Sequence, residues 1–308
     1  MKVAVTGATG FIGRYLVSAL AAAGWEVVAL GRDPALLRTL EAPGIRTFAT
    51  GYGDDLGEAL DGAQAVVHLA GRRSQRTDDP LSFKPFAAVN LELLESLFFA
   101  ARDAGVSTFV LASTIAVYSG ANTVPYTEAQ TPAPLNPYGL SKLTGEQLLA
   151  LWGGACGMRT VSLRLAASFG YGERPSAVLM RFAAEAWARR PLIVRGNGRT
   201  GIDQIYVRDV VRAFEASLSR DAPGGIFNIG AGRVFTLLEM AETVNAAFGN
   251  VGNLRIEDPQ EGDAPQPYMS IEAARDRLGW SPQWSLEGAL DDFYKTWREA
   301  ESRPDGSW

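Results

Sequence analysis

Cysteine and histidine are almost absent from this chain. Its 308 residues include one of each, Cys156 and His68. A single cysteine excludes an internal disulfide and any cysteine-rich metal site, and a single histidine leaves no histidine pair for zinc or iron. The chemistry of this protein is therefore expected to need neither a thiol pair nor a structural metal.

Excess positive charge and long apolar runs are missing as well. Lys and Arg total 29 against 34 Asp and Glu, which gives a formal net charge of −5. Nucleic acids and anionic membranes favour an excess of Lys and Arg, so neither is expected as a main partner. No apolar run approaches the roughly 20 residues that span a bilayer, and the N-terminus shows no signal-peptide pattern. We expect a soluble, cytoplasmic protein.

What the chain has is an alternation of short apolar strands and helices. Strands are predicted at residues 2–5, 26–30, 45–49, 65–69, 108–112 and 160–165, and helices at residues 11–23, 90–104 and 138–151. Such alternation indicates βαβ units and a parallel sheet that is covered on both faces. The predicted fold class is α/β, with a Rossmann-type doubly wound parallel sheet.

The pattern changes after about residue 169, where Pro, Gly and Arg become frequent and helices lack regular partner strands. We therefore predict an NAD(P)-binding Rossmann domain over residues 1–168, which residues 203–230 rejoin. A smaller C-terminal substrate-binding lobe is predicted over residues 169–202 and 231–301. Residues 302–308 are expected to form a tail.

A glycine-rich turn joins the first predicted strand to the first helix. TGATGFIG places Gly7, Gly10 and Gly13 three residues apart. Small residues let the backbone approach a pyrophosphate, and the helix N-terminus supplies free N–H groups. With a strand before it and a helix after it, this turn predicts dinucleotide binding.

The end of the second predicted strand bears on which nicotinamide nucleotide is bound. An acidic residue there would accept from a ribose 2′-hydroxyl, but this strand ends in Gly31 and Arg32. Gly31 leaves room, and the Arg32 guanidinium suits a 2′-phosphate. Asp33, which follows, is interpreted as the cap of the next helix. NADP(H) is the predicted preference, with NAD(H) as the alternative.

The segment NPYGLSK places Tyr138 and Lys142 four residues apart, on one helical face. A phenol with a pKa of about 10 is a poor proton shuttle at neutral pH, and a nearby ammonium lowers that pKa. The predicted strand at residues 108–112 is followed by Ser113 and Thr114. A hydroxyl at this strand end is able to hold a substrate oxygen while Tyr138 exchanges its proton.

Together the motifs resemble the extended short-chain dehydrogenase/reductases of the NAD-dependent epimerase/dehydratase family. The resemblance covers nearly the whole chain and rests on TGATGFIG, GDDL, VVHLAG, AVN, STIAVY, YGLSK, QIYVRDVVRAF, IFNIGAG and RLGWSPQWSLEGAL. It implies that Thr114 carries the catalytic hydroxyl with Ser113 beside it, and that Tyr138 is the general acid and base. Lys142 would lower the pKa of Tyr138 and hold the nicotinamide ribose.

The same resemblance implies further cofactor contacts and an assembly. Besides the three glycines, Arg32, Tyr138 and Lys142, the implied cofactor residues are Thr9, Phe11, Ile12, Asp55, Leu56, Leu69, Ala70, Gly71 and Asn90. The family often pairs two apolar helices into a four-helix dimer interface. The helices at residues 90–104 and 138–151 carry long apolar stretches, so a homodimer is expected; the alternative is that these stretches are buried within the monomer.

Departures from the family's motifs narrow the chemistry. Dehydratases carry Asp-Glu after the catalytic Thr, and here these positions are Ile115 and Ala116, which cannot move a proton. The Asn that is typical of epimerases after Arg164 is Ala167. The two arginines that hold a diphosphate correspond to Ile202 and Gln260. A dehydratase is therefore disfavoured, and the usual nucleotide-sugar contacts are reduced.

Arginines elsewhere offer other contacts for a substrate. The segment GRRSQR carries Arg72, Arg73 and Arg76 where substrate and nicotinamide meet in this fold. They would bind an anionic group such as a carboxylate or phosphate; alternatively, they form an exposed run balanced by Asp78 and Asp79. The full set of predicted substrate contacts is Arg73, Arg76, Thr114, Tyr138, Ser168, Arg174 and Arg199.

The predicted function is an NADP(H)-dependent ketoreductase acting on a sugar, expected to be nucleotide-linked. Gly31 and Arg32 favour NADPH, the usual cellular reductant, and the lost diphosphate contacts weaken the analogy with epimerases. The alternative is a sugar-nucleotide epimerase that retains its cofactor. A more distant alternative is a non-catalytic NADP-sensing protein, which the presence of Thr114, Tyr138 and Lys142 disfavours.

Overall fold

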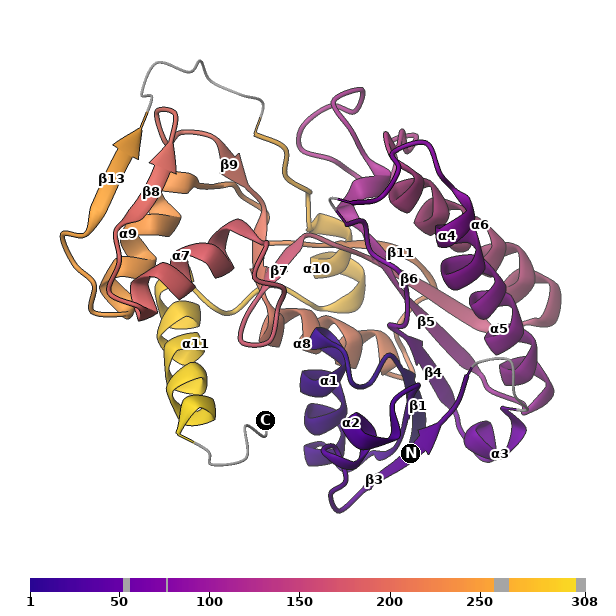
Figure 1. The fold of residues 1–308 in the computed structure, drawn as a ribbon. Coiled ribbons are helices and arrows are strands. Elements are labelled where there is room, and N and C mark those ends of the chain that lie inside the picture. The colour runs from indigo at the N-terminus through magenta and orange to yellow at the C-terminus, as the bar shows by residue number, and fades with distance from the viewer. Residues whose placement is uncertain (52–55, 76, 258–265, 303–308) are drawn as a thin grey trace.

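A computed structural model describes residues 1–51, 56–75, 77–257 and 266–302 (Figure 1). At its centre lies a seven-stranded sheet of order β11-β6-β5-β4-β1-β2-β3, in which all neighbouring strands are parallel. In that order the strands span Gly225–Ile229, Arg159–Leu165, Thr108–Thr114, Ala65–His68, Lys2–Thr6, Glu26–Gly31 and Ile45–Ala49.

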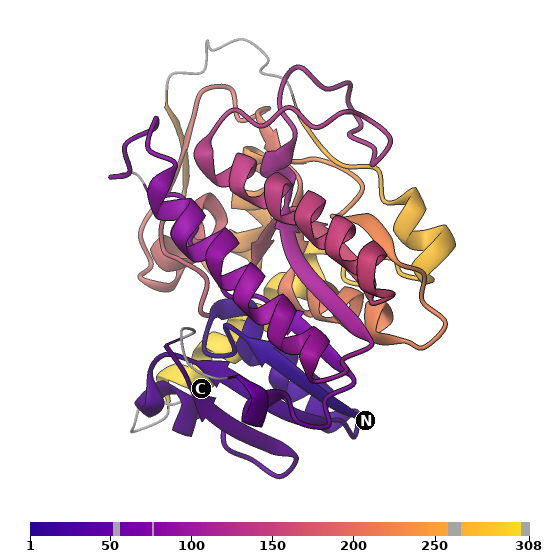
Figure 2. The same ribbon diagram turned by 90° about the vertical axis from the view of Figure 1, so that its right-hand side faces the viewer.

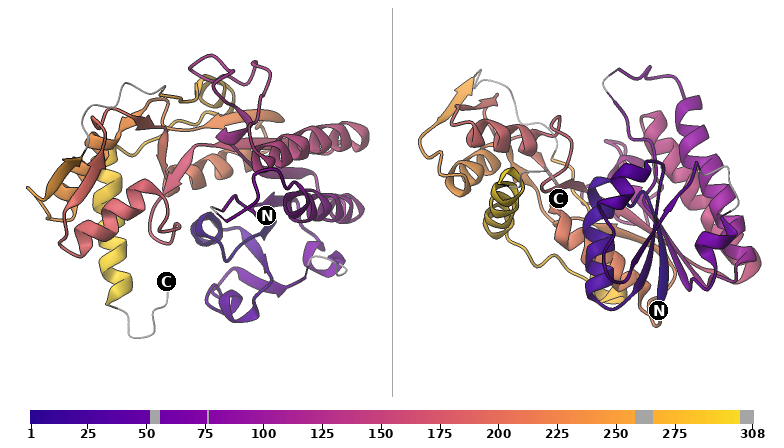
Figure 3. Two further views of the ribbon diagram at one scale, coloured as in Figure 1. Left: turned by 45° about the horizontal axis from the view of Figure 1, so that its top comes forward. Right: turned by 60° about the horizontal axis from the view of Figure 1, so that its bottom comes forward.

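Helices cover both faces of this sheet, and the alternation along β1 shows why. Val3 and Val5 belong to a core shared with α1 (Phe11–Ala22) and α8 (Val207–Leu218). Ala4 points the other way, into a core shared with α3 (Gly57–Leu60), α5 (Leu93–Asp103) and α6 (Pro137–Cys156). The right panel of Figure 3 shows the sheet between these layers. The predicted Rossmann-type fold is confirmed.

The helix predicted at residues 90–104 begins earlier and is not regular. α4 (Lys84–Ala87), a π-helical turn η1 (Ala88–Glu92) and α5 follow one another without a break. Figure 2 shows this run lying beside α6 on the outer face of the sheet.

Within the described residues, no helix combines the length and the apolarity that a membrane crossing requires.

A second lobe lies to one side of the sheet and has its own core (Figure 1). Its helices are α7 (Val178–Trp187), α9 (Leu237–Ala247) and α11 (Leu286–Glu301). Three short strand pairs complete it and join it to the sheet: β7 (Ala167–Phe169) with β10 (Gln204–Tyr206), β9 (Gly201–Ile202) with β12 (Phe235–Thr236), and β8 (Leu192–Arg195) with β13 (Leu254–Glu257).

One element expected in the lobe lies elsewhere. The lobe was predicted to hold all of residues 231–301, but α10 (Glu272–Leu278) packs against β11 of the central sheet. Ala274 and the buried Trp280 belong to the core of the sheet, and the Trp280 Nε1 donates to the Asp209 carbonyl at 3.0 Å. The segment that contains α10 thus returns from the lobe to cover β11, the last strand of the sheet.

The short helix α2 (Pro34–Arg38) and the 3₁₀ turn η2 (Ile115–Val117) complete the elements.

The order in which the chain adds strands reverses at β1, because β2 and β3 lie on one side of it and β4, β5, β6 and β11 on the other. The backbone segments that follow β1 and β4 come into contact at this point. Gly7 follows β1 with φ of +67°, and a Cβ on it would lie 2.7 Å from the Ala70 nitrogen. A Cβ on Gly13, in the first turn of α1, would lie 2.2 Å from the Gly7 carbonyl oxygen. Because ligands of open α/β sheets bind at such a reversal, the glycines place the candidate site here.

Gly13→Ala tests this contact. Its methyl group has no room against the Gly7 backbone, so we expect the free energy of unfolding to fall by about 3 kcal/mol. Gly154→Ala is the matched control, since Gly154 also lies in a helix but faces open space. The control should gain up to about 1 kcal/mol. Urea unfolding of both variants measures the difference, and equal effects would contradict the argument.

Candidate active site

A cavity of about 530 Å³ opens at the carboxyl ends of β1, β2 and β4. Small residues line much of it, which leaves backbone amides accessible to a ligand. The N-terminus of the twelve-residue helix α1 lies at its edge, where Gly10 is the N-cap and has no side chain to satisfy the free amides. The lining residues are Gly7, Thr9, Gly10, Gly31, Arg32, Gly51, Leu69, Ala70, Gly71, Ala88, Val89, Glu92, Leu93 and Ser96. This arrangement suits the phosphates of a dinucleotide.

Several of the predicted cofactor residues do not line this cavity, and their contacts with a cofactor stay predictions. Gly13 serves close packing instead, and the Phe11 ring stands edge-on to the Tyr15 ring at 5.9 Å. Ile12 lines the neighbouring cavity, and Leu56 is buried in the core between the sheet and α5. Asp55 lies outside the described residues. The cofactor contacts predicted for Phe11 and Leu56 are therefore not supported by the cavity lining.

At the end of β2, the structure separates the roles of Arg32 and Asp33. The Asp33 carboxylate accepts from the Ala35 and Leu36 amides at 2.8 and 3.3 Å, so it caps α2. Arg32 lines the cavity and is exposed. Asp33, the acidic residue that follows Arg32 in the sequence, is therefore engaged in capping α2. The Arg32 guanidinium is available to an anion.

Asn90 acts behind the cavity rather than in it. It lies within the π-helical turn η1, its Oδ1 accepts from the Arg72 amide at 2.7 Å, and its Nδ2 donates to the Arg72 carbonyl at 3.1 Å. The same Nδ2 donates to the Ser141 hydroxyl at 2.8 Å. Asn90 thus ties the loop after β4 to α6. These contacts give Asn90 a positioning role, and its predicted contact with the cofactor stays a prediction.

A second cavity of about 300 Å³ adjoins the first and shares Leu69 and Gly71 with it. It brings together all four predicted catalytic residues: Ser113 and Thr114 at the end of β5, and Tyr138 and Lys142 on α6. Its other lining residues are Ile12, Arg72, Arg73, Ala112, Ile115, Leu165, Ala166, Ala167, Ser168 and Glu173. The predicted hydroxyls, phenol and ammonium therefore share one cavity beside the nucleotide-sized one.

The electrostatics around Tyr138 differ from the prediction. Burial raises the pKa of Tyr138 above its usual value, while the charge of Arg73 and then a hydrogen bond with Thr114 lower it. Arg174 lowers it further, and Glu173 raises it. The sequence had assigned the lowering charge to Lys142. The structure gives that role first to Arg73, which comes from the loop after β4.

Lys142 is almost fully buried and serves as a link between the two cavities. Its Nζ donates to the Ala112 carbonyl at 3.0 Å, and it lies close to Gly71, where an added Cβ would be 3.2 Å from Nζ. Burial lowers the pKa of Lys142 to about 8, although the charge of Glu146 opposes this. An ammonium between the nucleotide cavity and the catalytic one is well placed to hold a ribose hydroxyl.

Glu173 is a site residue that sequence reasoning missed. It is only 5% exposed, and both of its carboxylate oxygens accept from Arg73 Nη1 at 2.9 Å. The Arg174 amide also donates to it at 2.7 Å, and Arg174 Nη1 donates to the Ser74 carbonyl at 3.3 Å. Since Arg73 and Glu173 lie 100 residues apart, no local pattern reveals the pair.

The other predicted substrate contacts are only partly gathered here. Ser168 lines the catalytic cavity, and Arg174 acts on Tyr138 through its charge without lining the cavity. Arg199 is exposed, lies far from Ser168 and Arg174 in the sequence and comes shortly before β9. Arg76 lies outside the described residues.

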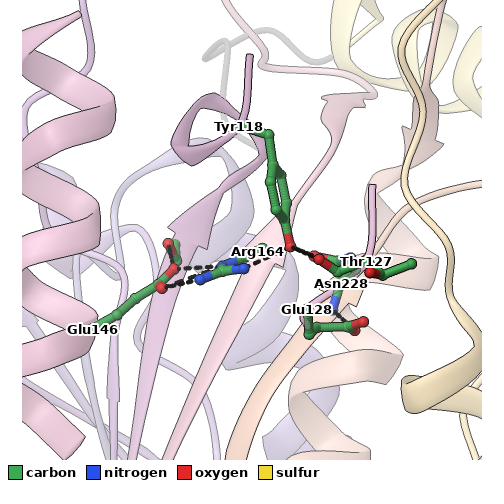
Figure 4. A network of polar contacts seen from close by, with 7 residues as sticks. Tyr118, Thr127, Glu128, Glu146, Arg164 and Asn228 are labelled. Atoms are coloured by element: carbon green, nitrogen blue, oxygen red, sulfur yellow. Dashed lines mark hydrogen bonds and ion pairs between the residues drawn. The ribbon is translucent and has the colours of Figure 1, made fainter. Parts of the chain in front are cut away.

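A buried polar network underlies the catalytic residues (Figure 4). Glu146 on α6 accepts from Arg164 of β6 through two nitrogens, Nε at 3.0 Å and Nη2 at 2.7 Å, and both side chains are at most 2% exposed. Ser113 donates its hydroxyl to Glu146 as well. Ser113 lines the cavity, but its hydroxyl is engaged by Glu146, which leaves Thr114 as the hydroxyl for the reacting oxygen beside Tyr138.

The network continues across the sheet from Arg164. Its Nη1 donates to the Tyr118 hydroxyl at 2.6 Å, and that hydroxyl donates to Asn228 Oδ1 at 3.0 Å. The backbone N–H of Asn228 in turn donates to the Glu128 carboxylate at 2.7 Å. Glu146 was not predicted, although its spacing of four residues from Lys142 places it on the same helical face as Tyr138.

Arg164→Met tests the weight of this network. It leaves the Glu146 carboxylate buried with Ser113 as its remaining partner, so we expect a loss of about 3–5 kcal/mol in the free energy of unfolding. The double variant Glu146→Gln/Arg164→Met should recover part of that loss. Arg190→Met is the control, because its ion pair with Glu185 is exposed and contributes little. Similar losses in Arg164→Met and Arg190→Met would contradict this account.

Comparison with known proteins shows which family the chain belongs to. Residues 3–230 match the NAD dependent epimerase/dehydratase family. A relative named as an uncharacterized UDP-glucose epimerase of Bacillus subtilis is 30% identical over 303 residues, which cover 94% of this chain and 96% of the relative. The structure of UDP-N-acetylglucosamine 4-epimerase from Bacillus cereus has a TM-score of 0.85 at 28% identity and covers 99% of both chains.

MoeE5 in complex with UDP-glucose and NAD is a second structural relative. It has a TM-score of 0.83 at 30% identity and covers 98% of this chain and all of its own. The match covers almost the whole chain, and therefore both the sheet and the second lobe. The chain therefore belongs to the NAD dependent epimerase/dehydratase family.

Proposed function

We propose that this protein is a sugar-nucleotide epimerase that oxidises a secondary alcohol of its substrate and returns the hydride to the opposite face of the same carbon. The observation that carries the proposal is the meeting of the two cavities at Leu69 and Gly71, with Tyr138, Thr114 and Lys142 beside that junction. Relatives named as UDP-sugar epimerases support it. They favour the epimerase over the ketoreductase that the sequence had put first.

The residues present fit a nicotinamide nucleotide. The larger cavity is lined by Gly7, Gly10, Gly31 and Gly71, and a Cβ on Gly7 would collide with the end of β4. These residues would hold the phosphates and the riboses, with Lys142 at the nicotinamide end. When bound, the nicotinamide supplies a hydride acceptor and donor.

The proton follows a path through the chain's own residues. As the substrate alcohol loses its hydride, the Tyr138 phenolate accepts the hydroxyl proton, and a ketone remains. Thr114, which is hydrogen-bonded to Tyr138, holds the reacting oxygen in both directions. When the hydride returns, Tyr138 gives the proton back to the ketone oxygen. Burial raises the pKa of Tyr138 and so disfavours the phenolate that begins this cycle, and the charge of Arg73 partly offsets that effect.

Arg32 supports a preference for NADP(H) over NAD(H). It lines the nucleotide cavity beside Gly31, and Asp33 is committed to capping α2. An exposed guanidinium at this strand end suits a 2′-phosphate. The same observation favours a second candidate function, an NADPH-dependent ketoreductase that acts on a keto-sugar and exchanges its cofactor at every turnover.

For the substrate and the assembly, two further features support proposals. Arg73, Arg174 and Arg199 are the proposed contacts for anionic groups of a sugar nucleotide. The outer face of α6 exposes Leu140 to 45% and Leu151 to 67%, eleven residues apart and hence on one side of the helix. We propose a homodimer that buries this face together with α5.

The retained nucleotide decides between the two functions. The purified protein, with nothing added, should release an oxidised nicotinamide nucleotide on denaturation and should interconvert UDP-sugar 4-epimers, which chromatography separates. Tyr138→Phe should keep the nucleotide and lose epimerisation by a factor of about 10²–10⁴. After stripping, wild type should bind NADPH more tightly than NADH, and Arg32→Ser should lose this preference.

An empty protein that requires stoichiometric NADPH to reduce a keto-sugar would replace the epimerase with the ketoreductase. Wild type and Arg32→Ser with the same ratio of NADPH to NADH affinity would remove the proposed role of Arg32. Tyr138→Phe with full epimerisation would remove Tyr138 from the mechanism.

The pH dependence of the oxidation step tests Arg73. Arg73→Met removes the charge that lowers the pKa of Tyr138, so that pKa rises and less phenolate is present at a given pH. The rate at which substrate reduces the bound nucleotide in a single turnover should rise with pH as the phenolate forms. We expect the midpoint of this rise to lie at higher pH in Arg73→Met than in wild type. Arg73→Lys keeps the charge and should move it less, and the exposed Arg190→Met is the control. A midpoint that stays in place would contradict the role of Arg73.

A further inference from the structure

A third cavity, of about 370 Å³, continues from the catalytic one. The two share Ile115 and Ala167, so one ligand is able to occupy both. The third cavity lies between the segment that follows β5 and the segment that contains β9. Its lining residues are Ile115, Ala116, Tyr118, Ser119, Gly120, Tyr126, Ala167, Gly201, Ile202, Asp203 and Pro267.

The third cavity is unsuited to an anionic group. Neither Lys nor Arg is among its described lining residues. Its one carboxylate, Asp203, is 2% exposed and accepts from the Ala231 amide at 2.8 Å and the Met269 amide at 3.1 Å. Burial raises the pKa of Asp203 to about 6, so it is ionised at neutral pH. A fixed negative charge without a lining cation disfavours a phosphate or a carboxylate here.

The polar atoms of this cavity are largely engaged within the protein. The Tyr118 hydroxyl lies between Arg164 and Asn228, and the rings of Tyr118 and Tyr126 stack at 5.0 Å. Both tyrosines are at most 5% exposed. Apolar contact is therefore what the cavity has to offer a ligand, through aliphatic side chains and aromatic rings.

Positions that differ from motifs of the family converge on this cavity. Ile115 and Ala116 stand where dehydratases of the family carry Asp and Glu, and Ala167 and Ile202 stand where its epimerases carry Asn and Arg. These positions belong to three separate segments of the chain and meet only in the fold. All four side chains are apolar, so each adds apolar surface to the wall of the cavity.

We propose that the third cavity is a subsite for an apolar group carried by the substrate, such as an alkyl, acyl or deoxy substituent adjoining the reacting sugar. The proposal rests on the proposed function in one respect, namely that the reacting carbon lies beside Tyr138. From there, Ile115 and Ala167 lead directly into the subsite. The substrate class is thus a sugar derivative with a hydrophobic substituent on the side away from the nucleotide cavity.

A series of n-alkyl β-D-glucosides from methyl to hexyl tests this subsite in the intact protein. Calorimetric titration should show the Kd falling about fourfold for each added methylene until the cavity is filled. Ile202→Thr adds a hydroxyl to the wall and should weaken hexyl glucoside by about three- to tenfold, with little effect on methyl glucoside. Ile193→Thr is the matched control, since Ile193 is 45% exposed on β8 and lines none of the three cavities.

Three results would overturn the proposal. One is a Kd that does not change with chain length, which includes the failure of hexyl glucoside to bind. The second is an equal effect of Ile202→Thr and Ile193→Thr. The third is displacement of hexyl glucoside from wild type by inorganic pyrophosphate, with stronger displacement from Ile202→Thr, because it would put an anion in this cavity.

The titration measures binding alone, so it is independent of hydride transfer. Chain-length-dependent binding without epimerisation would remove the proposed function and leave the subsite. Epimerisation of UDP-sugars without any chain-length dependence would remove the subsite and leave the function.

Discussion

The buried ion pair between Glu146 and Arg164 is the contact on which the geometry of the active site depends. An ion pair in the core is stable only when every polar atom has a partner, because both charges lose their hydration. Here Ser113 and Tyr118 complete the set. The hydrogen bonds of this set fix the rotation of α6 relative to β5 and β6. Tyr138, Lys142 and Glu146 lie on one face of α6, so the same rotation points the phenol and the ammonium toward the end of β5.

Backbone packing between β1 and β4 sets the other half of the site. Gly7 approaches Ala70 so closely that a side chain has no room, and this brings the nucleotide cavity to the point where the loop after β4 begins. That loop carries Arg73, and Asn90 holds it against α6. A contact between two glycine-rich backbones thus decides where a cation stands relative to Tyr138. The fold and the electrostatics of the site are consequences of the same packing.

The sequence predicted what depends on local patterns. The glycine turn, the parallel strands and the helical pair of Tyr138 and Lys142 follow from spacing within a single element or its neighbours. What it did not predict depends on partners far apart, such as Arg73 with Glu173, and the return of α10 to the sheet. Glu146 is an intermediate case. Its spacing placed it on the catalytic face, but only burial shows that it pairs with Arg164.

The three cavities differ in charge, and this difference argues that they take different groups: the cofactor in the first, the reacting carbon in the second and a substituent of the substrate in the third. The first offers backbone amides and Arg32, which suit phosphates. The second concentrates Thr114, Tyr138 and Lys142, with Arg73 favouring the phenolate. The third has apolar walls and an ionised Asp203, which exclude what the first attracts. Because the cofactor takes the first cavity, the substrate has the second and the third to occupy. An apolar substituent is favoured in the third cavity and an anionic group is not, so the orientation of the reacting carbon at Tyr138 follows from electrostatics as well as from shape.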